Sequence, residues 1–522
     1  MGLGTAMTAR ARIDPAALNA LLVPYDRSDA PGFAVGVALG GIPGYRRGVG
    51  MASVELPVVL SPTIRMRIGS TSKHFTALAI MLLAEERRLS IDDSPRKVLP
   101  ELPGWADAIT LRQMMAHTSG MRDSLDLILH AAGPGVAAAP DIHLRTLAAL
   151  DSVNFAPGTS WSYNNGGYAL LAEIVTRVSG QSFADFLRER IFEPIGMNDT
   201  RLRPLDTDLV PNSATLHVPL PAGGYTRGVF GVPIGGEGGI VSTVDDMLLW
   251  LKHMSDPVVG SRETWQTMRT PMTSHGYGLG LIAGRHRGLA AVHHAGAVVG
   301  GSCQMLKLVD HQLDVIVMSN GIGGLDLHNL VDAIIESCIP GLPLPEDVPA
   351  EPITGIFHSA KTGRRLALEA IEGKQAIRID GMTLPARRDS EGRLSVPLVP
   401  TDMAVIAQPD GMALAVEEYG RTDILWRVEA PKDAEIDSLV GQYENASAAI
   451  SAAIAKQGGG SALLTLSHSL GALNYALTAI GPALWEGRAT GSLPLAVLIE
   501  ARDDGLLLTS GRTLRLRFAP RS

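Results

Sequence analysis

The spacing of hydrophobic and polar positions changes along the chain, and the change predicts how the chain is divided. Up to about residue 342, alternating apolar runs such as 33–40 (FAVGVALG) are mixed with helical runs such as 110–117 (TLRQMMAH). A period of two predicts strands, and apolar positions three or four residues apart predict helices. The pattern therefore predicts a domain of mixed helices and strands over residues 1–342.

A break in the pattern follows at residues 339–352 (IPGLPLPEDVPAEP), where five prolines stand in a short acidic stretch. Proline lacks the N–H that helices and central strands need, so we expect a linker there. Beyond it, short alternating runs are separated by Gly, Asp or Asn turns. This texture predicts two all-β domains, 349–430 and 436–522, joined by a hinge at residues 431–437.

The two predicted β domains begin alike. Gly355-Ile-Phe-His-Ser-Ala and Gly441-Gln-Tyr-Glu-Asn-Ala start 86 residues apart. A repeat of this length suits a small barrel that buries its own interior. We therefore expect each domain to be a β-barrel that opens with this segment.

Composition and charge narrow the range of functions. The 522 residues are 46% hydrophobic and 19% charged, with a net charge of −8, which is typical of a globular protein and argues against nucleic-acid binding. The N-terminus has no apolar stretch long enough for the core of a signal peptide, and the longest apolar runs, of about ten residues, are too short to cross a membrane. The two cysteines, Cys303 and Cys338, are expected to be buried thiols, which fits a cytoplasmic protein. The histidines show no metal-ligand spacing and no cofactor fingerprint is present, so we expect no metal and no cofactor.

One short motif offers catalytic chemistry. Ser70-Thr71-Ser72-Lys73 precedes the helical run HFTALAIMLLAEERR. Residues i and i+3 lie on one face of a helical turn, so the Lys73 amine can reach the Ser70 hydroxyl. The helix N-terminus disfavours an ammonium, which helps Lys73 to accept a proton, and its N–H groups can hold an oxyanion. Ser70 is therefore a candidate nucleophile.

The same pattern also has a purely structural interpretation. A helix cap followed by a surface lysine explains Ser70 and Lys73 about equally well when the motif is taken alone. A second S-x-x-K stands at residues 94–97 (SPRK), in a charged, proline-bounded segment. No apolar helix follows it, so we expect a solvated loop at Ser94.

Two further segments supply polar side chains. In residues 157–165 (PGTSWSYNN), a Pro-Gly turn delivers Tyr163 and Asn165 before a helical run. A tyrosine beside a lysine can relay protons and an amide can bind a substrate carbonyl, whereas the structural alternative is a loop aromatic packed on a helix start. His294-Ala295-Gly296-Ala297 follows an alternating run. We expect it on an edge strand whose backbone approaches a ligand.

These three elements, in this order, resemble those of the penicillin-recognising serine hydrolases. That group includes class C β-lactamases, D-Ala-D-Ala carboxypeptidases, family VIII esterases and D-aminopeptidases. The resemblance covers about residues 30–335 and extends to 117–121 (HTSGM), 191–197 (IFEPIGM), 238–243 (GGIVST) and 277–281 (YGLGL). It implies a β-lactamase-like α/β (α+β) domain, with an all-α subdomain and an antiparallel sheet flanked by helices.

Within this group, the third element looks like that of the D-aminopeptidases. β-Lactamases and carboxypeptidases usually have Lys-Thr-Gly there, and the lysine binds the substrate carboxylate, whereas His294 is mostly neutral at pH 7. D-Aminopeptidases of this type carry two C-terminal eight-stranded, lipocalin-like barrels, and the chain length agrees with this. In that family a loop of the last barrel restricts the active site; the matching stretch, residues 487–493, looks shorter here, which implies a more open site.

The resemblance also implies roles for single residues. Ser70 would be the nucleophile, and Lys73 and Tyr163 the general base and acid. The backbone N–H groups of Ser70 and Ala297 would form the oxyanion hole. The substrate-binding residues that it implies are Asn165, His294, Gly296 and Ala297.

The implied activity is release of N-terminal D-amino acids from short peptides, amides and esters through an acyl-enzyme. Two alternatives stay open: a family VIII-type carboxylesterase or β-lactamase/peptidase on the same scaffold, and a non-catalytic peptide-binding sensor. The expected partner is a small molecule or short peptide, with no nucleic acid and no membrane. Homologues of this architecture are often dimers, so a homodimer is a further expectation.

Overall fold

The computed structural model describes residues 10–342, 345–396, 403–418, 420–431, 436–457, 461–491 and 494–521. Parts of three predicted segments lie outside these residues: 343–344 of the linker, 432–435 of the hinge and 492–493 of the barrel loop. The chain forms two compact units. The first takes Met1–Asp93 and Tyr168–Pro345, and the second takes Ser94–Gly167 and Glu346–Ser522.

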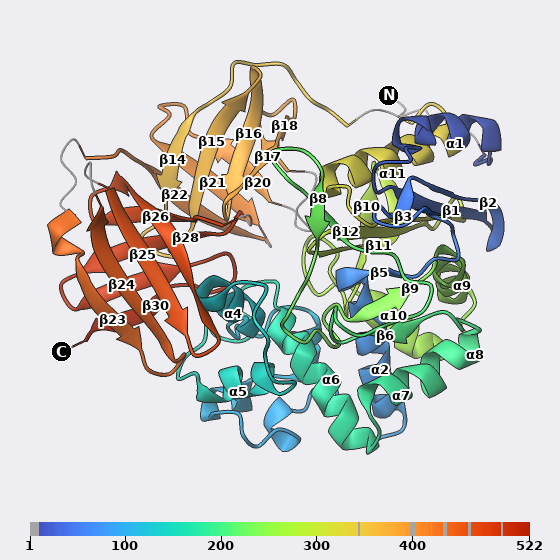
Figure 1. Ribbon diagram of the computed structural model, residues 1–522, viewed down its shortest axis with the longest axis horizontal. Helices are drawn as coiled ribbons and strands as arrows, with labels where there is room; N and C mark the ends of the chain where they lie inside the picture. The colour runs from blue at the N-terminus through green and yellow to red at the C-terminus, as the bar shows by residue number, and fades with distance from the viewer. Residues whose placement is uncertain are drawn as a thin grey trace, which may run out of the picture. The chain divides into compact units, whose positions relative to one another are not determined.

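An antiparallel six-stranded sheet lies at the centre of the first unit (Figure 1). In order of pairing, its strands are β10 (Ile282–His286), β11 (Leu289–Val298), β12 (Gly301–Leu308), β13 (Leu313–Ser319), β1 (Phe33–Leu39) and β2 (Ile42–Val49). The adjacent strands β13 and β1 are buried almost throughout, because helices cover both faces of the sheet. This explains why the run at 33–40 is continuously apolar.

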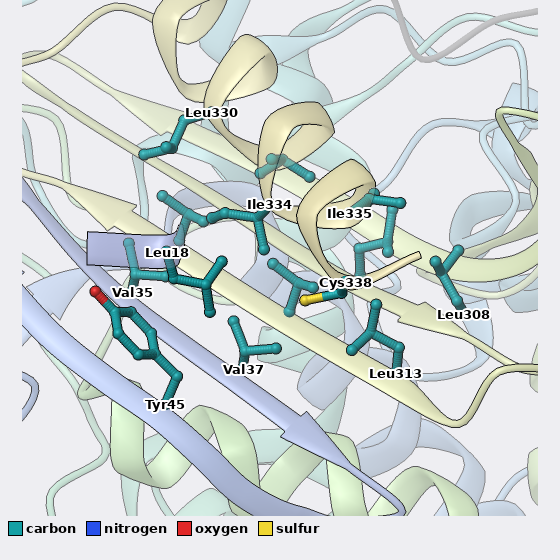
Figure 2. Packing of buried hydrophobic residues seen from close by; sticks show 14 of the residues in the cluster. Leu18, Val35, Val37, Tyr45, Leu308, Leu313, Leu330, Ile334, Ile335 and Cys338 are labelled. Atoms are coloured by element: carbon teal, nitrogen blue, oxygen red, sulfur yellow. The ribbon is translucent and has the colours of Figure 1, made fainter. Parts of the chain in front are cut away.

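Helices α1 (Pro15–Leu22) and α11 (Gly324–Cys338) pack on one face of this sheet. The side chains that meet there include Leu18, Val35, Val37, Leu313, Ile334 and Cys338 (Figure 2). On the other face, α9 (Val244–Ser255) lies against Gly36, where an added Cβ would come 2.5 Å from Val244. Position 36 therefore needs glycine, because α9 packs directly on the strand backbone.

Most of the helices lie between the two halves of the sheet in the sequence. They are η2 (Gly69–Ser72), α2 (Lys73–Glu85), η3 (Pro95–Lys97), η4 (Gly104–Ala108), α3 (Leu111–Met115), α4 (Ser124–Ala132), α5 (Ile142–Ala149), α6 (Asn165–Ser179), α7 (Phe183–Leu187), η5 (Arg188–Phe192), α8 (Glu193–Ile195) and α10 (Arg262–Arg269). A capping box formed by Thr110 and Gln113 begins α3, which confirms the helix predicted at 110–117. The β-lactamase-like arrangement of helices and antiparallel sheet is thus present.

Short ladders complete the first unit, and one of them supports the segment around residue 70. They are β3 (Met51–Ser53) with β4 (Val58–Val59), β5 (Met66–Arg67) with β9 (Ile240–Ser242) and β6 (Arg201–Leu202), and β7 (His217–Pro219) with β8 (Tyr225–Arg227). The β5–β9 pair continues with a hydrogen bond from Ile68 N–H to the Ile240 carbonyl at 3.1 Å. The chain just before Ser70 is therefore fixed by β9.

Residues 355–428 of the second unit form a nine-stranded antiparallel sheet. In order of pairing, the strands are β17 (Met382–Pro385), β16 (Lys374–Ile379), β15 (Arg365–Ile371), β14 (Gly355–His358), β22 (Arg421–Val428), β21 (Ala413–Glu418), β20 (Ala404–Ala407), β19 (Leu394–Ser395) and β18 (Arg387–Arg388). β17 and β18 follow each other in the chain but lie at opposite ends of this order, so the barrel is nearly closed. The resemblance implies eight strands, but nine are present because the extended segment 382–388 is interrupted at Ala386. Its first part, β17, pairs with β16 at one end of the order, and its second part, β18, pairs with β19 at the other end.

Residues 441–520 form a closed antiparallel barrel of eight strands (Figure 1). In order, these are β23 (Gly441–Asn445), β24 (Ile450–Gln457), β25 (Ser461–His468), β26 (Gly471–Gly481), β27 (Leu484–Ala489), β28 (Ala496–Arg502), β29 (Gly505–Thr509) and β30 (Leu516–Pro520). Each repeated segment opens its sheet, since β14 begins at Gly355 and β23 at Gly441. The aromatic third residue of each repeat, Phe357 or Tyr443, is buried. The predicted β architecture is confirmed.

A buried ionic cluster joins the nine-stranded sheet to the barrel. Glu486 of β27 accepts hydrogen bonds from Arg365 of β15 and Arg378 of β16. The side chains of Arg365, Arg378 and Glu486 are only 7%, 6% and 4% exposed. Burial lowers the pKa of Arg365, and the Glu486 charge opposes that effect. The carboxylate is therefore needed to hold two guanidinium groups away from water.

Among the described helices, none is long and apolar enough to cross a membrane. Within the described ranges, no three His, Cys, Asp or Glu side chains are grouped in a way that could hold a metal ion. Cys303 on β12 and Cys338 on α11 are both buried free thiols, as the sequence predicts.

Candidate active site

Ser70 lies in a tight turn at the start of a buried helix. The turn is η2, and from Lys73 to Leu83 every residue of the following helix α2 is buried. Gly69, with φ of +52°, precedes Ser70, and a Cβ at Gly69 would come 2.7 Å from the Ala297 nitrogen. Glycine is required here because the backbone of β11 approaches this turn closely.

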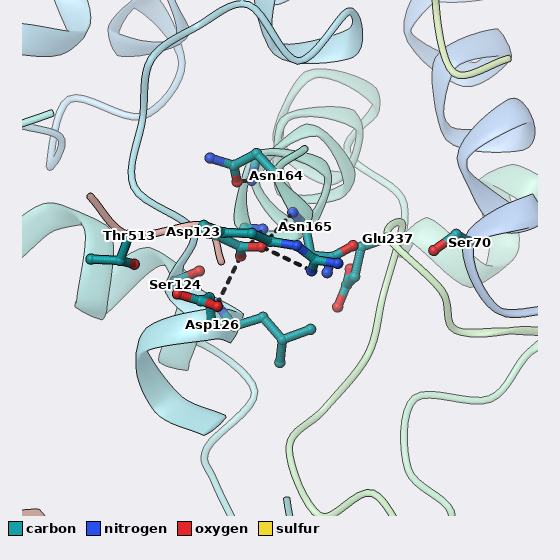
Figure 3. Close-up of polar contacts among 12 residues, drawn as sticks. Ser70, Asp123, Ser124, Asp126, Asn164, Asn165, Glu237 and Thr513 are labelled. Atoms are coloured by element: carbon teal, nitrogen blue, oxygen red, sulfur yellow. Dashed lines mark hydrogen bonds and ion pairs between the residues drawn. The ribbon is translucent and has the colours of Figure 1, made fainter. Parts of the chain in front are cut away.

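Lys73 is fully buried and contacts Ser70. Its Nζ lies 3.3 Å from Ser70 Oγ and donates to the Glu237 carbonyl at 2.6 Å. The same nitrogen lies 5.3 Å from the centre of the Tyr168 ring. Ser70 itself is only partly buried, and in Figure 3 its hydroxyl points to the side on which Glu237 lies. The spacing i, i+3 thus brings amine and hydroxyl together, as the sequence predicts.

The segment around Glu237 is fastened to α2 and η2 by hydrogen bonds. Thr76 Oγ1 donates to the Gly236 carbonyl at 2.7 Å, and Ser72 Oγ accepts the Ile240 N–H at 3.2 Å. A Cβ at Gly236 would come 2.8 Å from Thr76, so the glycine allows this close packing. Sequence reasoning missed Glu237, because it contributes a main-chain carbonyl that any residue could offer.

His294 lies on β11 and is 3% exposed. Its Nδ1 lies 2.6 Å from the Ala295 carbonyl, and its Nε2 lies 3.1 Å from Tyr277 Oη. Since a carbonyl only accepts, Nδ1 carries the proton and Nε2 accepts from the Tyr277 hydroxyl. Burial, together with the neighbouring His74 and Lys73, lowers the pKa of His294 well below 6.5. The imidazole is therefore neutral at pH 7, as expected.

The strand position of His294 is only partly as predicted. β11 is not an edge strand, because β10 pairs with it as far as His293. From His294 to Val298, the described pairings join β11 to β12 alone. On its other side this half of the strand approaches the turn of Ser70, where a Cβ at Gly296 would come 1.9 Å from the Ile68 carbonyl. The edge character is thus local, because β10 is too short to reach it.

Tyr163 and Asn165 belong to the second unit, where α6 begins. Asn164 caps α6, since its Oδ1 accepts the Gly167 N–H at 2.7 Å. The Asn164 N–H donates to His117 Nδ1 at 3.1 Å, and the rings of His117 and Tyr163 lie 4.2 Å apart. The 117–121 segment therefore sets the position of Tyr163, whose side chain is partly buried.

Asp123 organises the same turn (Figure 3). Its fully buried carboxylate accepts N–H groups from Asn165 at 3.0 Å, from Gly166 at 2.9 Å and from Leu125 at 3.0 Å. Arg512 of the barrel lies 3.4 Å from the same carboxylate. An anion at helix N-termini is stabilised by the exposed N–H groups and the helix dipole. Sequence reasoning missed Asp123, although an aspartate directly before a helix is an N-cap signal.

The second S-x-x-K differs from the first. Ser94 Oγ accepts the Arg96 N–H at 3.2 Å and donates to the Ala106 carbonyl at 2.9 Å. Ser94 thus caps η3 and is partly buried, so the expected solvated loop is wrong. The expectation failed because a proline directly after a serine is also a helix-start signal. Ser94 serves as a structural cap.

The predicted site residues therefore fall into two groups. Those of the first unit, which lie on η2, α2 and β11, are Ser70, Lys73, His294, Gly296 and Ala297. Tyr163 and Asn165 belong to the second unit and share the contacts of Asp123 and His117.

A comparison with protein families assigns the N-terminal part of the chain. The beta-lactamase family model matches residues 18–335, which is more than half of the chain. The chain therefore belongs to the beta-lactamase family.

Curated relatives narrow the comparison. Over 357 residues the chain is 30% identical to the D-aminopeptidase of Brucella canis, a match that covers 66% of either chain. It is 31% identical over 300 residues to the D-aminopeptidase of Brucella anthropi, covering 56% of this chain and 57% of that relative. The chain thus matches somewhat less than two thirds of the length of these relatives.

Solved structures share the fold. The octameric penicillin-binding protein homologue from Pyrococcus abyssi has a TM-score of 0.57 at 21% identity, covering 88% of this chain and 100% of that one. The D-amino acid amidase from Ochrobactrum anthropi SV3 has a TM-score of 0.54 at 22% identity, covering 62% and 97%. The β-lactamase-like fold expected from the sequence is confirmed.

Proposed function

We propose that this protein is a serine hydrolase that acylates Ser70 and releases N-terminal D-amino acids from short peptides, amides and esters. The observation that carries the proposal is the buried Lys73 amine, 3.3 Å from Ser70 Oγ. A lysine at that distance can take the hydroxyl proton, whereas a cap with a surface lysine would leave the amine in water. The relationship to D-aminopeptidases supports the substrate class.

In the proposed first step, Ser70 Oγ attacks the substrate carbonyl carbon and its proton passes to the pair formed by Lys73 and Tyr163. We propose that the two groups share this proton, so that either member can hold it. The N–H groups of Ser70 and Ala297 stabilise the oxyanion. The C–N or C–O bond then breaks, and the leaving amine or alcohol takes the proton from the pair.

Deacylation reverses these roles. A water molecule loses a proton to the same pair and attacks the ester carbonyl of the acyl-enzyme. The bond to Ser70 Oγ breaks, the proton returns to that oxygen, and the acid leaves. We propose that Asn165 and His294 orient the substrate, with Gly296 and Ala297 as the backbone beside it.

The state of His294 supports a substrate without a carboxylate at that position. Burial lowers its pKa well below 6.5, so it supplies no positive charge at neutral pH. A Lys-Thr-Gly element would supply one. Amides and esters of amino acids fit such a site better than peptides that must be held by a free carboxyl end.

The test is kinetics on paired substrates: D-Ala and L-Ala p-nitroanilide, p-nitrophenyl butyrate and nitrocefin. We expect turnover of the D-anilide to exceed that of the L-anilide. Ser70→Ala should lose about a thousandfold or more of that turnover, and Ser94→Ala, which removes only a cap, should keep it. Faster hydrolysis of the butyrate or of nitrocefin would instead support the esterase or β-lactamase alternative. An active Ser70→Ala would refute the assignment.

We also propose a cytoplasmic location and a homodimer. The buried free thiols Cys303 and Cys338 are compatible with a reducing compartment. Cell fractionation would test the location, and sedimentation of the purified protein would test the assembly state.

A further inference from the structure

Within the second unit, a turn of the C-terminal barrel is fastened to the segment before α6. The turn joins β29 to β30 across residues 510–515, and its contacts are made by residues 510–514. Asn154 binds it from both directions, since its Nδ2 donates to the Arg512 carbonyl at 2.8 Å and its Oδ1 accepts the Leu514 N–H at 2.9 Å. Arg122 donates to the Leu514 carbonyl at 2.7 Å. The backbone of Arg512 is therefore fixed.

A second set of contacts fixes the start of the same turn. Ser510 donates a hydrogen bond from its hydroxyl to the Asp126 carboxylate, and its Oγ accepts the Thr513 N–H at 3.2 Å. Ser510 and Asp126 are both buried. The turn is therefore held at both ends by residues of the 122–126 and 154 region.

This turn places a positive charge beside Tyr163. The Arg512 guanidinium carbon lies 5.0 Å from the centre of the Tyr163 ring, within the usual range of a cation–π contact. Its Nη1 lies 3.4 Å from Asp123 Oδ2, and 38% of its side chain is exposed. Burial opposes the charge, but Asp123, Asp126 and Tyr163 outweigh it and raise the pKa of Arg512. The guanidinium is thus charged at every working pH.

Other titratable groups of the second unit also face Tyr163. His117 lies against the ring at 4.2 Å, and its Nδ1 accepts the Asn164 N–H, so that nitrogen carries no proton. Asp123 contacts Arg512 and the main chain of Asn165. Of the three described residues His117, Asp123 and Arg512, Arg512 is the one that carries a positive charge at every working pH.

We propose that Arg512 is a positioning residue for Tyr163, supplied by the C-terminal barrel. The guanidinium holds the ring in one orientation and favours negative charge on the phenol oxygen, because an opposite charge nearby stabilises the ionised form. The inference rests on the proposed function, in which Tyr163 exchanges a proton with Lys73. In this inference, the barrel acts on Tyr163 through residues 510–514, which form a different turn from the 487–493 loop that the family resemblance implies.

The experiment compares Arg512→Gln, Arg512→Lys and Tyr163→Phe in the full-length chain. The control is Arg517→Ala, because Arg517 on β30 has a 63% exposed side chain paired with Asp504. With the best anilide of the panel, we expect Arg512→Gln to lower kcat/KM about 10- to 100-fold. The acid side of its pH profile should move upward by about one unit. Arg512→Lys keeps the charge and should keep the wild-type profile. Arg517→Ala should match the wild type.

A double variant separates positioning from a structural role. If Arg512 acts through Tyr163, adding Arg512→Gln to Tyr163→Phe should reduce kcat/KM no further. A wild-type rate and pH profile in Arg512→Gln would overturn the inference. So would a loss that only follows the fraction of folded protein, measured by circular dichroism. If Tyr163→Phe itself keeps full turnover, the proposed function fails along with the inference; if Tyr163→Phe is inactive while Arg512→Gln is normal, only the inference fails.

Discussion

Replacing Asp123 with asparagine tests how firmly the turn before α6 is held. Asp123 Oδ1 accepts the N–H groups of Leu125 and Gly166, and Oδ2 accepts that of Asn165. The side-chain carbonyl of an asparagine can replace only one of these two oxygens, and in the Oδ1 position it still accepts two of the three N–H groups. The NH2 group of the asparagine then faces the Asn165 N–H and the Arg512 guanidinium. Because all three groups are hydrogen-bond donors, the Asn165 N–H and Arg512 lose their acceptor.

The magnitude follows from these contacts. A buried donor left without an acceptor costs about 1–3 kcal/mol, and two donors are affected here, one of which is charged. We therefore expect Asp123→Asn to weaken the local structure by about 2–4 kcal/mol. A loss of 2 kcal/mol corresponds to about 30-fold more frequent opening of the turn.

Hydrogen exchange followed by mass spectrometry measures that opening directly. Peptides that contain the amides of Asn165 and Gly166 should exchange at least about 30-fold faster in Asp123→Asn. Asp107→Asn is the matched control, because Asp107 is 62% exposed in an ion pair with Arg96 and should change stability by less than about 1 kcal/mol. Equal exchange in Asp123→Asn and the wild type would refute this account of the turn.

Three further outcomes are expected. Burial lowers the pKa of His74 to about 3, whereas the pKa of this histidine in the unfolded chain is near 6.5, so below pH 6.5 the unfolded state binds the proton and the free energy of unfolding falls by about 1.4 kcal/mol per pH unit. In urea unfolding between pH 7.5 and 5, His74→Gln should remove this contribution to the pH dependence of stability. An unchanged pH dependence would contradict the prediction. Burial raises the pKa of Cys303 to about 12 and that of Cys338 to about 11, so iodoacetamide at pH 8 should label neither until urea is added, as peptide mass spectrometry would show. Glu486→Gln should destabilise the second unit by about 3–5 kcal/mol in denaturant unfolding, because it leaves two buried guanidinium groups without their carboxylate. Glu391→Gln is the control, because the Glu391 side chain is 75% exposed and its replacement should leave the unfolding midpoint unchanged. Equal midpoints for Glu486→Gln and the wild type would contradict the importance of the buried cluster.

Features set by local geometry could be predicted from the sequence. The pairing of Ser70 with Lys73 follows from the pitch of a helix, which places residues three apart on one face. The β domains follow from period-two alternation, and the repeat at Gly355 and Gly441 follows from the need to begin each sheet with a buried aromatic. Each of these depends on neighbours within a few positions of the chain.

Features set by distant contacts could not be predicted. Asp123 and Arg512 are separated by 389 positions, and neither residue type announces the other. The partial edge position of His294 depends on where β10 begins, at Ile282, and the glycine-rich sequence before that residue does not specify this. The ninth strand of the first β domain depends on the pairing partners on either side of Ala386, since β17 pairs with β16 and β18 pairs with β19.

The barrel contacts also explain why the family match alone gives an incomplete account of the site. The match ends at residue 335, yet Arg122, 5% exposed, donates to a carbonyl of the barrel turn. Burial lowers the pKa of Arg122 to about 10, so its charge is tolerated only with acceptors in place. Asn154 likewise uses both ends of its amide on the same turn. The hydrogen bonds of Arg122 and Asn154, which precede Tyr163 in the chain, are therefore completed by a barrel turn that lies beyond the residues matched by the family model. Within the second unit, the barrel thus supports the helical segment structurally.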